Sequence, residues 1–191
     1  AVTDLKIHPK RKEIAVGTAG GNFEIWSLLE AEQLQNINKF EAALTKVAFD
    51  NNGQRIISAL ENGSVHIWEY STSLHLKTLS GHERPVESLD FSFDSKRLIS
   101  SAADKSVRVW ELGSSEAPEK FEMGTHRVLA VRFVPGSENF STAGIDSSVI
   151  IWDGKDGNPI RELKFHQGKV NALSFHPHEP VLLSVGSDKQ W

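Results

Sequence analysis

The sequence predicts an all-β protein in which one small sheet is repeated along the chain. Three observations predict it: tryptophans at a constant spacing, short runs in which apolar and polar residues alternate, and turn-forming residues between the runs. Trp26, Trp68, Trp110 and Trp152 are each separated by 42 residues. A period of this length indicates repeats that must stack on their neighbours to bury their apolar faces.

Other positions follow the same spacing. A position 21 residues before each tryptophan is aliphatic, a position 19 before is apolar and usually phenylalanine, and a position six before is a turn residue. A fifth copy of each is present near the C-terminus. The three series are Leu5, Val47, Leu89, Val131 and Leu173; Ile7, Phe49, Phe91, Phe133 and Phe175; and Gly20, Asn62, Asp104, Asp146 and Asp188.

The third copy, residues 80–110, shows the pattern most fully. Val86–Phe91 and Val107–Trp110 alternate with the period of two that is typical of half-buried strands. Short polar residues at Asp94-Ser95 and around Asp104 favour tight turns between them. With Gly81-His82 near its start and Trp110 at its end, this unit resembles one WD40 repeat.

The resemblance covers essentially the whole chain and implies a WD40 β-propeller of four-stranded antiparallel sheets. We expect four complete repeats and a truncated fifth, at approximately residues 1–40, 41–79, 80–122, 123–165 and 166–191. Trp191 falls outside the tryptophan series, in the register of Val65, Val107 and Val149, so the fifth repeat stops inside its third strand. We therefore expect the chain to be a segment of a larger propeller of about seven sheets.

Composition excludes several function classes. The formal net charge is −4, so no overall field attracts nucleic acid or a membrane. The absence of cysteine excludes disulfides and cysteine-ligated zinc. There is neither an apolar run of membrane-spanning length nor a leader sequence, and an intracellular protein of the cytoplasm or nucleus is the expectation.

His82, Ser100 and Asp104 have the composition of a catalytic triad, which needs a hydroxyl beside an imidazole that a carboxylate orients. The resemblance to WD40 repeats implies a different role. In that family His82, Ser100, Asp104 and Trp110 correspond to a buried structural tetrad that fixes the strands. The fifth copy repeats His166, Ser184 and Asp188, which favours the structural interpretation over a single active site.

Other copies depart from the tetrad, and we expect them to depend more on apolar packing. The first copy has Val16 and Gly20 in place of the serine and aspartate. The second has Phe40 for the histidine and Asn62 for the aspartate. In the fourth copy Gly124 occupies the histidine register, with His126 two places later, and Thr142 replaces the serine.

Histidines and glycines invite two further hypotheses, and neither is favoured. His176 and His178 flank Pro177, but zinc needs three or four converging ligands and no others are evident. Gly20-Gly21 lacks the following helix that a phosphate-binding loop requires. No metal, cofactor or small-molecule substrate is therefore expected, and we expect no catalytic activity.

Partner binding is expected at loops that precede the first strand of each repeat and at the turns between second and third strands. In the propeller topology these loops emerge on one face. They carry five cations: Arg84, Lys105, Arg127, Lys169 and Lys189. The loops between third and fourth strands, on the opposite face, are acidic: Glu30, Glu32, Glu69, Glu111, Glu116, Asp153 and Asp156.

Three functions remain open at this point. The first is a non-catalytic protein-interaction scaffold in a multiprotein complex, which the resemblance implies. The second is a scaffold of an RNA–protein assembly, in ribosome biogenesis or RNA processing, whose five cations contact phosphates. Residues 81–110, 133–135 and 142–144 loosely resemble WD40 proteins of ribosome-assembly complexes. The third, a propeller hydrolase, depends only on the grouping of His82, Ser100 and Asp104.

Overall fold

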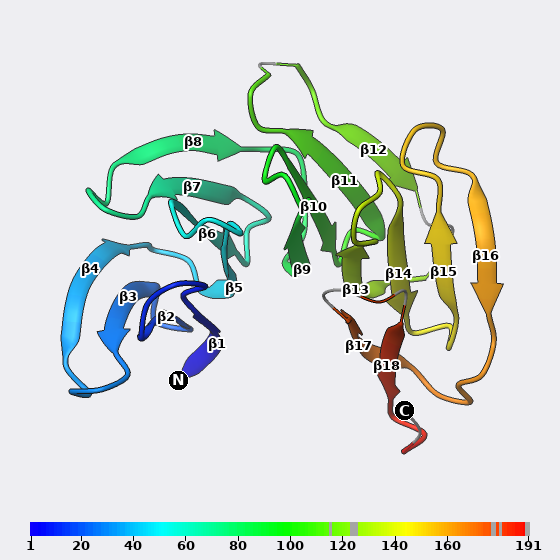
Figure 1. Ribbon diagram of the computed structural model, residues 1–191, viewed down its shortest axis with the longest axis horizontal. Helices are drawn as coiled ribbons and strands as arrows, with labels where there is room; N and C mark the ends of the chain where they lie inside the picture. The colour runs from blue at the N-terminus through cyan, green and yellow to red at the C-terminus, as the bar shows by residue number, and fades with distance from the viewer. Residues whose placement is uncertain (115, 123–125, 177–178, 180, 190–191) are drawn as a thin grey trace. The chain divides into compact units, whose positions relative to one another are not determined.

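The chain folds entirely into β-strands in the part that the structure describes. The computed structural model describes residues 1–114, 116–122, 126–176, 179 and 181–189, and these residues contain no helix (Figure 1). The strands are β1 (Val2–Ile7), β2 (Glu13–Thr18), β3 (Asn22–Ser27), β4 (Gln33–Lys39), β5 (Leu44–Phe49), β6 (Arg55–Leu60), β7 (Val65–Glu69), β8 (His75–Leu79), β9 (Val86–Phe91), β10 (Arg97–Ala102), β11 (Ser106–Glu111), β12 (Glu119–Glu122), β13 (Val128–Phe133), β14 (Phe140–Gly144), β15 (Val149–Trp152), β16 (Pro159–Leu163), β17 (Val170–Phe175) and β18 (Leu182–Gly186).

These strands form four four-stranded sheets and one two-stranded sheet, each from consecutive strands. The sheets are β1–β4, β5–β8, β9–β12, β13–β16 and β17–β18, and we call them the first to the fifth sheet. All the strand pairings whose register is described are antiparallel. The residues form two compact units, Ala1–Val86 and Glu87–Trp191. The all-β class and the series of four-stranded sheets predicted from the sequence are confirmed.

Turn conformation repeats with the same period as the tryptophans. The turn between second and third strands places one residue in the left-handed region: Gly21 at φ 82°, Gly63 at 88°, Lys105 at 68°, Ser147 at 67° and Lys189 at 63°. Glycine adopts this conformation without a steric cost, whereas other residues are strained there. The first two sheets therefore have the residue that the turn favours, and the remaining three do not.

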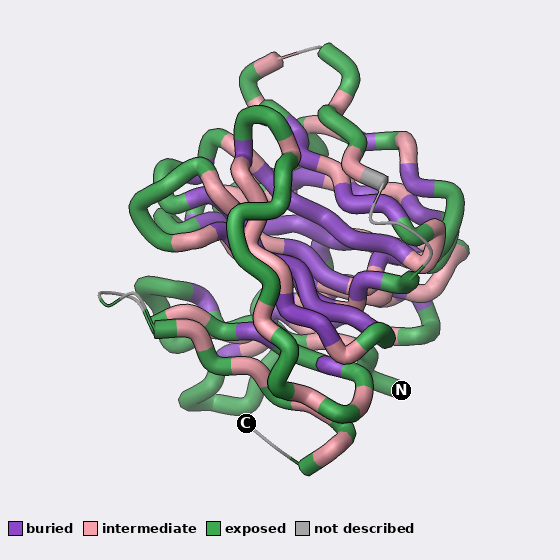
Figure 2. Tube along the Cα trace, turned by 90° about the vertical axis from the view of Figure 1, so that its right-hand side faces the viewer, coloured by how far each residue is buried: buried purple, intermediate pink, exposed green. Residues whose placement is uncertain are grey.

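Apolar side chains that face inward join neighbouring sheets into cores. One cluster packs the first sheet against the second within the first unit, with Phe23 and Ile25 facing Leu44 and Val47. In the second unit, Ile99 and Val107 pack with Val131 and Phe140, and Ala143 packs with Leu173. Figure 2 shows burial concentrated along the strands and exposure at the turns. Stacking buries the faces that a lone small sheet leaves in water.

The strand assignments made from the sequence agree with the structure to within a few residues. Val86–Phe91 is found as β9, and Val107–Trp110 lies within β11, which begins one residue earlier and ends one residue later. Trp191, Pro177 and His178 lie outside the described residues.

Candidate interaction edges and the polar interior

The turns of a sheet lie at the two ends of its strands, and we call each of these ends an edge of the sheet. At one edge, which we call the cationic edge, the turn between second and third strands meets the residue that precedes the first strand. The same backbone hydrogen bond recurs there in four sheets: Ala19 to Ala1 and Glu61 to Ala43 at 2.9 Å, Ile145 to Arg127 at 3.1 Å, and Ser187 to Lys169 at 2.9 Å. These bonds place the loops carrying the predicted cations beside each other within a sheet.

The structure places the five cations predicted to bind partners on exposed loops of this edge. Lys105, Lys169 and Lys189 are exposed, and none of them forms an ion pair with another described residue. Arg127 is different, because its guanidinium pairs with Glu87 of β9 in the same unit. Arg84 is exposed and belongs to the first unit. In the second unit, Lys105, Lys169 and Lys189 are thus the exposed cations of this edge for which no ion pair with a described residue is found.

Two of these lysines occupy strained positions. Lys105 and Lys189 take the left-handed conformation that glycine takes in the first two sheets. A non-glycine residue held there costs about 1–3 kcal/mol, and such strain is concentrated at functional sites. Ser147 takes the same conformation in the fourth sheet, so a non-glycine residue at this turn is common to the last three sheets.

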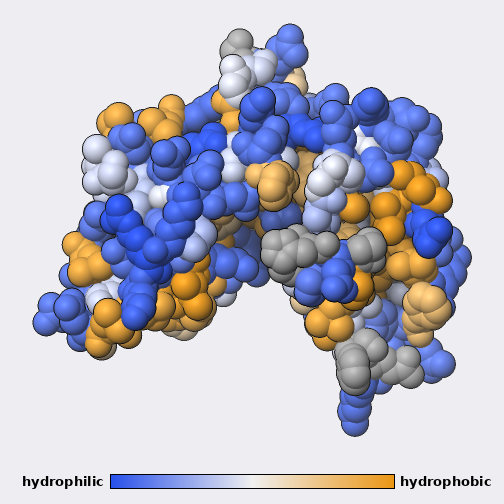
Figure 3. Space-filling view, in the orientation of Figure 1, coloured by the Kyte–Doolittle hydropathy of each residue, from blue (hydrophilic) through white to orange (hydrophobic). Residues whose placement is uncertain are grey.

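The first turn and the third loop of each sheet lie at the opposite edge. They are joined there by a similar set of backbone hydrogen bonds. Leu28 donates to the carbonyl of Lys12, Tyr70 to Gln54 and Leu112 to Lys96, each at 2.9 Å. Exposed carboxylates are frequent in its loops, including Glu30, Glu32, Glu111, Glu116 and Asp156. In Figure 3 hydrophilic residues predominate on the visible surface, with hydrophobic residues in separate patches.

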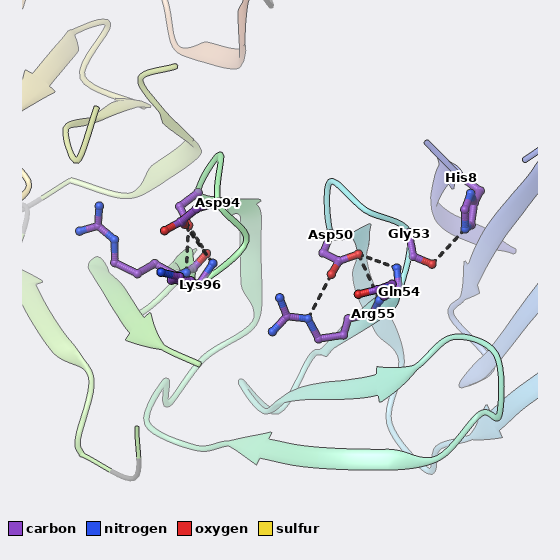
Figure 4. Close-up of polar contacts among 9 residues, drawn as sticks. His8, Asp50, Gly53, Gln54, Arg55, Asp94 and Lys96 are labelled. Carbon is purple, nitrogen blue, oxygen red and sulfur yellow. Dashed lines mark hydrogen bonds and ion pairs between the residues drawn. The ribbon is translucent and has the colours of Figure 1, made fainter. Parts of the chain in front are cut away.

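Residues that follow the first strands hold the turns of the opposite edge (Figure 4). Asp50 is almost fully buried; its carboxylate accepts the backbone N–H of Gln54 at 2.8 Å and Arg55 Nε at 3.1 Å. His8 Nδ1 accepts two backbone N–H groups, so the proton lies on Nε2, which donates to the Gly53 carbonyl at 3.1 Å. Sequence reasoning missed these roles, although the two residues are 42 positions apart.

Asp94 caps the corresponding turn of the third sheet. Its carboxylate accepts the Ser92 hydroxyl at 2.7 Å and the Lys96 N–H at 3.0 Å, and these two hydrogen bonds lower the pKa of Asp94. Beside it lies an open groove of about 420 Å³ that Phe93, Lys96 and Glu138 help to line. Phe93 is 78% exposed, where the corresponding residues of other repeats are Pro9, Asn51 and Pro135.

Tryptophan and hydroxyl pairs form the polar interior of three sheets. Trp68 Nε1 donates to Ser58 Oγ at 3.1 Å, Trp110 Nε1 donates to Ser100 Oγ at 2.8 Å, and Trp152 Nε1 donates to Thr142 Oγ1 at 2.8 Å. Ser58 and Ser100 are fully buried. Within the predicted tetrad, the Trp110–Ser100 pair is therefore present. Asp104 accepts the N–H of Ser106 at 3.0 Å, and His82 is buried.

The fifth sheet shows how the remaining tetrad members are arranged. His166 Nε2 lies 2.8 Å from Ser184 Oγ, and His166 Nδ1 lies 3.0 Å from both carboxylate oxygens of Asp188. The imidazole side chain is only 4% exposed. Asp188 also accepts the backbone N–H of Gln167 at 2.8 Å, so the trio ties the preceding loop to the turn. In the fourth sheet, His126 Nδ1 reaches Asp146 at 3.8 Å.

Where the tetrad residues are absent, other contacts replace them. In the first sheet, Trp26 Nε1 donates to Glu24 of its own strand at 3.0 Å. In the second, Phe40 packs edge-on to Trp68 with ring centroids 5.9 Å apart. The contact is of the apolar kind expected there, and the greater dependence of this sheet on apolar packing stays a prediction.

A further set of side chains, which sequence reasoning missed, links the first strands of neighbouring sheets. Asp4 accepts the backbone N–H of Val47 at 3.0 Å, and Ser88 accepts that of Val131 at 3.3 Å, in both cases 43 residues later. Asp90 accepts from Phe133 N at 2.8 Å. These acceptors satisfy N–H groups on the open side of an edge strand. The available signal was a short polar residue at an alternate position of the first strand, Asp4 in β1 and Ser88 and Asp90 in β9.

Among the described residues, no group of three or more His, Cys, Asp or Glu side chains is arranged to hold a metal ion. The described part of the chain also has no helix that is long and apolar enough to cross a membrane.

Comparison with known proteins identifies the repeat. Residues 32–69, 73–111, 119–153 and 157–191 match the family described as "WD domain, G-beta repeat". Together these segments cover most of the chain. A stretch of 56 residues is 39% identical to the U3 small nucleolar RNA-associated protein 12 of Saccharomyces cerevisiae. That stretch is 29% of this chain and only 6% of the yeast protein.

Proposed function

The chain belongs to the WD40-repeat family, with the all-β fold of a β-propeller, and we propose that it serves as a non-catalytic scaffold that binds other proteins at its cationic edge. Proteins of this family are generally scaffolds. The observation that carries the proposal is the set of exposed lysines at this edge of the second unit. Lys105, Lys169 and Lys189 lack an ion pair with the described residues, and two of them occupy strained turns.

Charge at this edge suits an acidic partner surface. Exposed cations at an interface rim mainly speed association and orient the partner, and they add little to affinity when solvated. The tight contacts must then come from the neighbouring loops. The proposal includes an intracellular location, in the cytoplasm or nucleus, which the sequence analysis also favoured.

An RNA–protein assembly is the second candidate. It is supported by the match to the yeast protein, whose name associates it with the U3 small nucleolar RNA. Under this hypothesis the same lysines contact phosphates, and the assembly belongs to ribosome biogenesis or RNA processing. Each phosphate contact that a lysine makes releases a counterion, so binding weakens steeply as salt increases.

For the polar interior we propose a structural role in place of hydrolysis. The trio of Ser184, His166 and Asp188 has the hydrogen bonds of a catalytic triad. The equivalent hydroxyls in three other sheets accept a tryptophan N–H, however, which is a packing role. We propose that His82 completes the same network with Ser100 and Asp104 in the third repeat.

Charge reversal tests the cationic edge. The variant Lys105→Glu/Lys169→Glu/Lys189→Glu is compared with Lys10→Glu/Lys12→Glu/Lys155→Glu, which changes three exposed lysines of the opposite edge by the same charge. Affinity purification from cells, with quantitative mass spectrometry after nuclease treatment, measures the bound proteins. We expect the first variant to lose a defined set of proteins that the second retains.

The outcomes distinguish the protein scaffold from the RNA–protein assembly, and they show when binding at the cationic edge is wrong. Equal retention by both variants contradicts binding at the cationic edge. Complexes that disappear after nuclease treatment, together with direct RNA crosslinks that the first variant loses, favour the RNA–protein assembly. If purified chain and RNA bind with no dependence on salt, direct phosphate contact is excluded.

A further inference from the structure

Two histidines and a threonine converge on the outer strands of the second sheet. His66 lies on β7, and His75 and Thr78 lie on β8. His66 Nδ1 is 3.4 Å from His75 Nε2, and Thr78 Oγ1 is 3.1 Å from each of these nitrogens. All three residues belong to the first unit.

The repeat itself does not require these histidines. The residues corresponding to His66 in the first, third and fourth sheets are Glu24, Arg108 and Ile150, and those corresponding to His75 are Gln33, Ala117 and Pro159. The third and fourth strands still pair at the position of His66 in those sheets, with Glu24 opposite Asn36, Arg108 opposite Lys120 and Ile150 opposite Glu162. The convergence is therefore a property of this sheet alone.

Hydrogen bonding determines which nitrogen of His66 carries the proton. Asn62 Oδ1 accepts the backbone N–H of Ser64 at 3.0 Å and also the Ser64 hydroxyl at 2.8 Å. Because that hydroxyl donates to Asn62, its oxygen accepts from His66 Nε2 at 3.0 Å. The lone pair of His66 therefore lies on Nδ1, the nitrogen that faces His75 and Thr78.

Packing holds both imidazoles in place. The His66 ring lies 5.0 Å from the Phe40 ring, and the His75 ring lies 4.8 Å from the Trp68 ring. Burial, and to a smaller extent the nearby His75, lower the pKa of His66.

We propose that His66 Nδ1 and His75 Nε2 form a binding site for one divalent transition-metal ion with zinc-like tetrahedral geometry, with the Thr78 hydroxyl beside it. Zinc binds imidazole nitrogens at about 2.0–2.1 Å, so two ligands at the tetrahedral angle are about 3.3–3.4 Å apart. The observed separation of 3.4 Å matches this value without any movement of the backbone.

The two imidazole nitrogens and the Thr78 hydroxyl are three converging donors, which make an open, exchangeable site, whereas a structural zinc centre is closed by four protein ligands. The remaining position belongs to water. Binding requires the proton of His75 to lie on Nδ1, so that Nε2 has a free lone pair. A bound ion joins β7 to β8 and therefore stabilises the folded first unit.

Zinc chloride added to the full chain at pH 7 tests the site. Calorimetry measures stoichiometry, and NMR of the histidine ring nitrogens locates the ion. We expect one equivalent of zinc to shift the signals of His66 and His75, and to raise the melting temperature. His75→Gln should lose this binding, and Ser64→Ala, which removes the partner of His66 Nε2, should weaken it about tenfold.

His126→Gln is the matched control, because it removes an exposed imidazole of the second unit and should leave zinc binding unchanged. Circular dichroism without zinc checks that His75→Gln is folded, and His75→Asn provides a second removal of the same ligand. The proposal is wrong if either folded variant binds zinc as tightly as the natural chain. It is also wrong if the shifts locate the ion at His126, His176 or His178.

Discussion

The first and third sheets have the same strand order but different polar interiors. Both are antiparallel four-stranded sheets, and their second and third strands pair in the same register. In the third sheet, Trp110 is 4% exposed and donates to the fully buried Ser100. In the first sheet, Trp26 is half-buried and donates to Glu24. Alternating apolar residues and turn-forming residues are therefore enough to form the sheet. The buried hydrogen bond between tryptophan and serine is not required for it.

The substitution of Val16 for serine explains the difference. Without a hydroxyl on the second strand, the indole N–H of Trp26 bonds a carboxylate two residues earlier on its own strand, on the same face. This bond links no strands. The Trp110–Ser100 bond joins β11 to β10, so it resists their separation, and its burial makes the loss of either partner costly.

Truncation of the tryptophans to alanine should give the largest difference in unfolding free energy between the two sheets. Trp110→Ala should cost about 3–5 kcal/mol of unfolding free energy, because it leaves a cavity in a buried site. Trp26→Ala should cost less, about 1–2 kcal/mol, because its indole is already half in water. Urea denaturation, with hydrogen exchange to assign each loss to a sheet, measures both. Equal losses would show that the two tryptophans are equivalent in packing.

Removal of the hydroxyl isolates the hydrogen bond. Ser100→Ala should cost about 1–3 kcal/mol, because it removes the buried hydroxyl that accepts the Trp110 Nε1–H. Val16→Ser, the reverse change in the first sheet, should leave stability almost unchanged while the indole N–H signal of Trp26 moves. A hydrolase would instead lose turnover in Ser100→Ala at an unchanged melting temperature, and that result would contradict the structural role.

Sequence alone predicted the strands and the tryptophan series because both depend on local alternation and on a fixed period. It could not predict which side chains meet across sheets. The bond from Val47 to Asp4 joins residues 43 positions apart, and the pairing of Arg127 with Glu87 depends on how two strands are stacked. The convergence of His66 with His75 depends on the register of β7 with β8, which no repeat pattern specifies. The assignment of the five cations to a binding surface stays a prediction.

The smallest expected difference in stability between the two sheets comes from the turn after the first strand, where the third sheet has Asp94 and the first has Lys10. Hydrogen bonds from Ser92 and Lys96 lower the pKa of Asp94 below its ordinary value of 3.8. In the unfolded chain these bonds are absent, so the carboxylate binds a proton more readily there. Its contribution to stability is therefore present above pH 3.8 and is lost as the pH falls through the lower folded value.

Asp94→Asn should accordingly reduce the difference in unfolding free energy between pH 5 and pH 3, measured by urea denaturation, whereas Lys10→Asn in the first sheet should not. NMR titration of the Asp94 carboxyl carbon gives the pKa directly. A midpoint at or above 3.8 would mean that the two donors do not favour the charged form. The turn would then be held without a carboxylate, as it is in the first sheet, where His8 Nδ1 accepts the backbone N–H groups of Lys10 and Arg11.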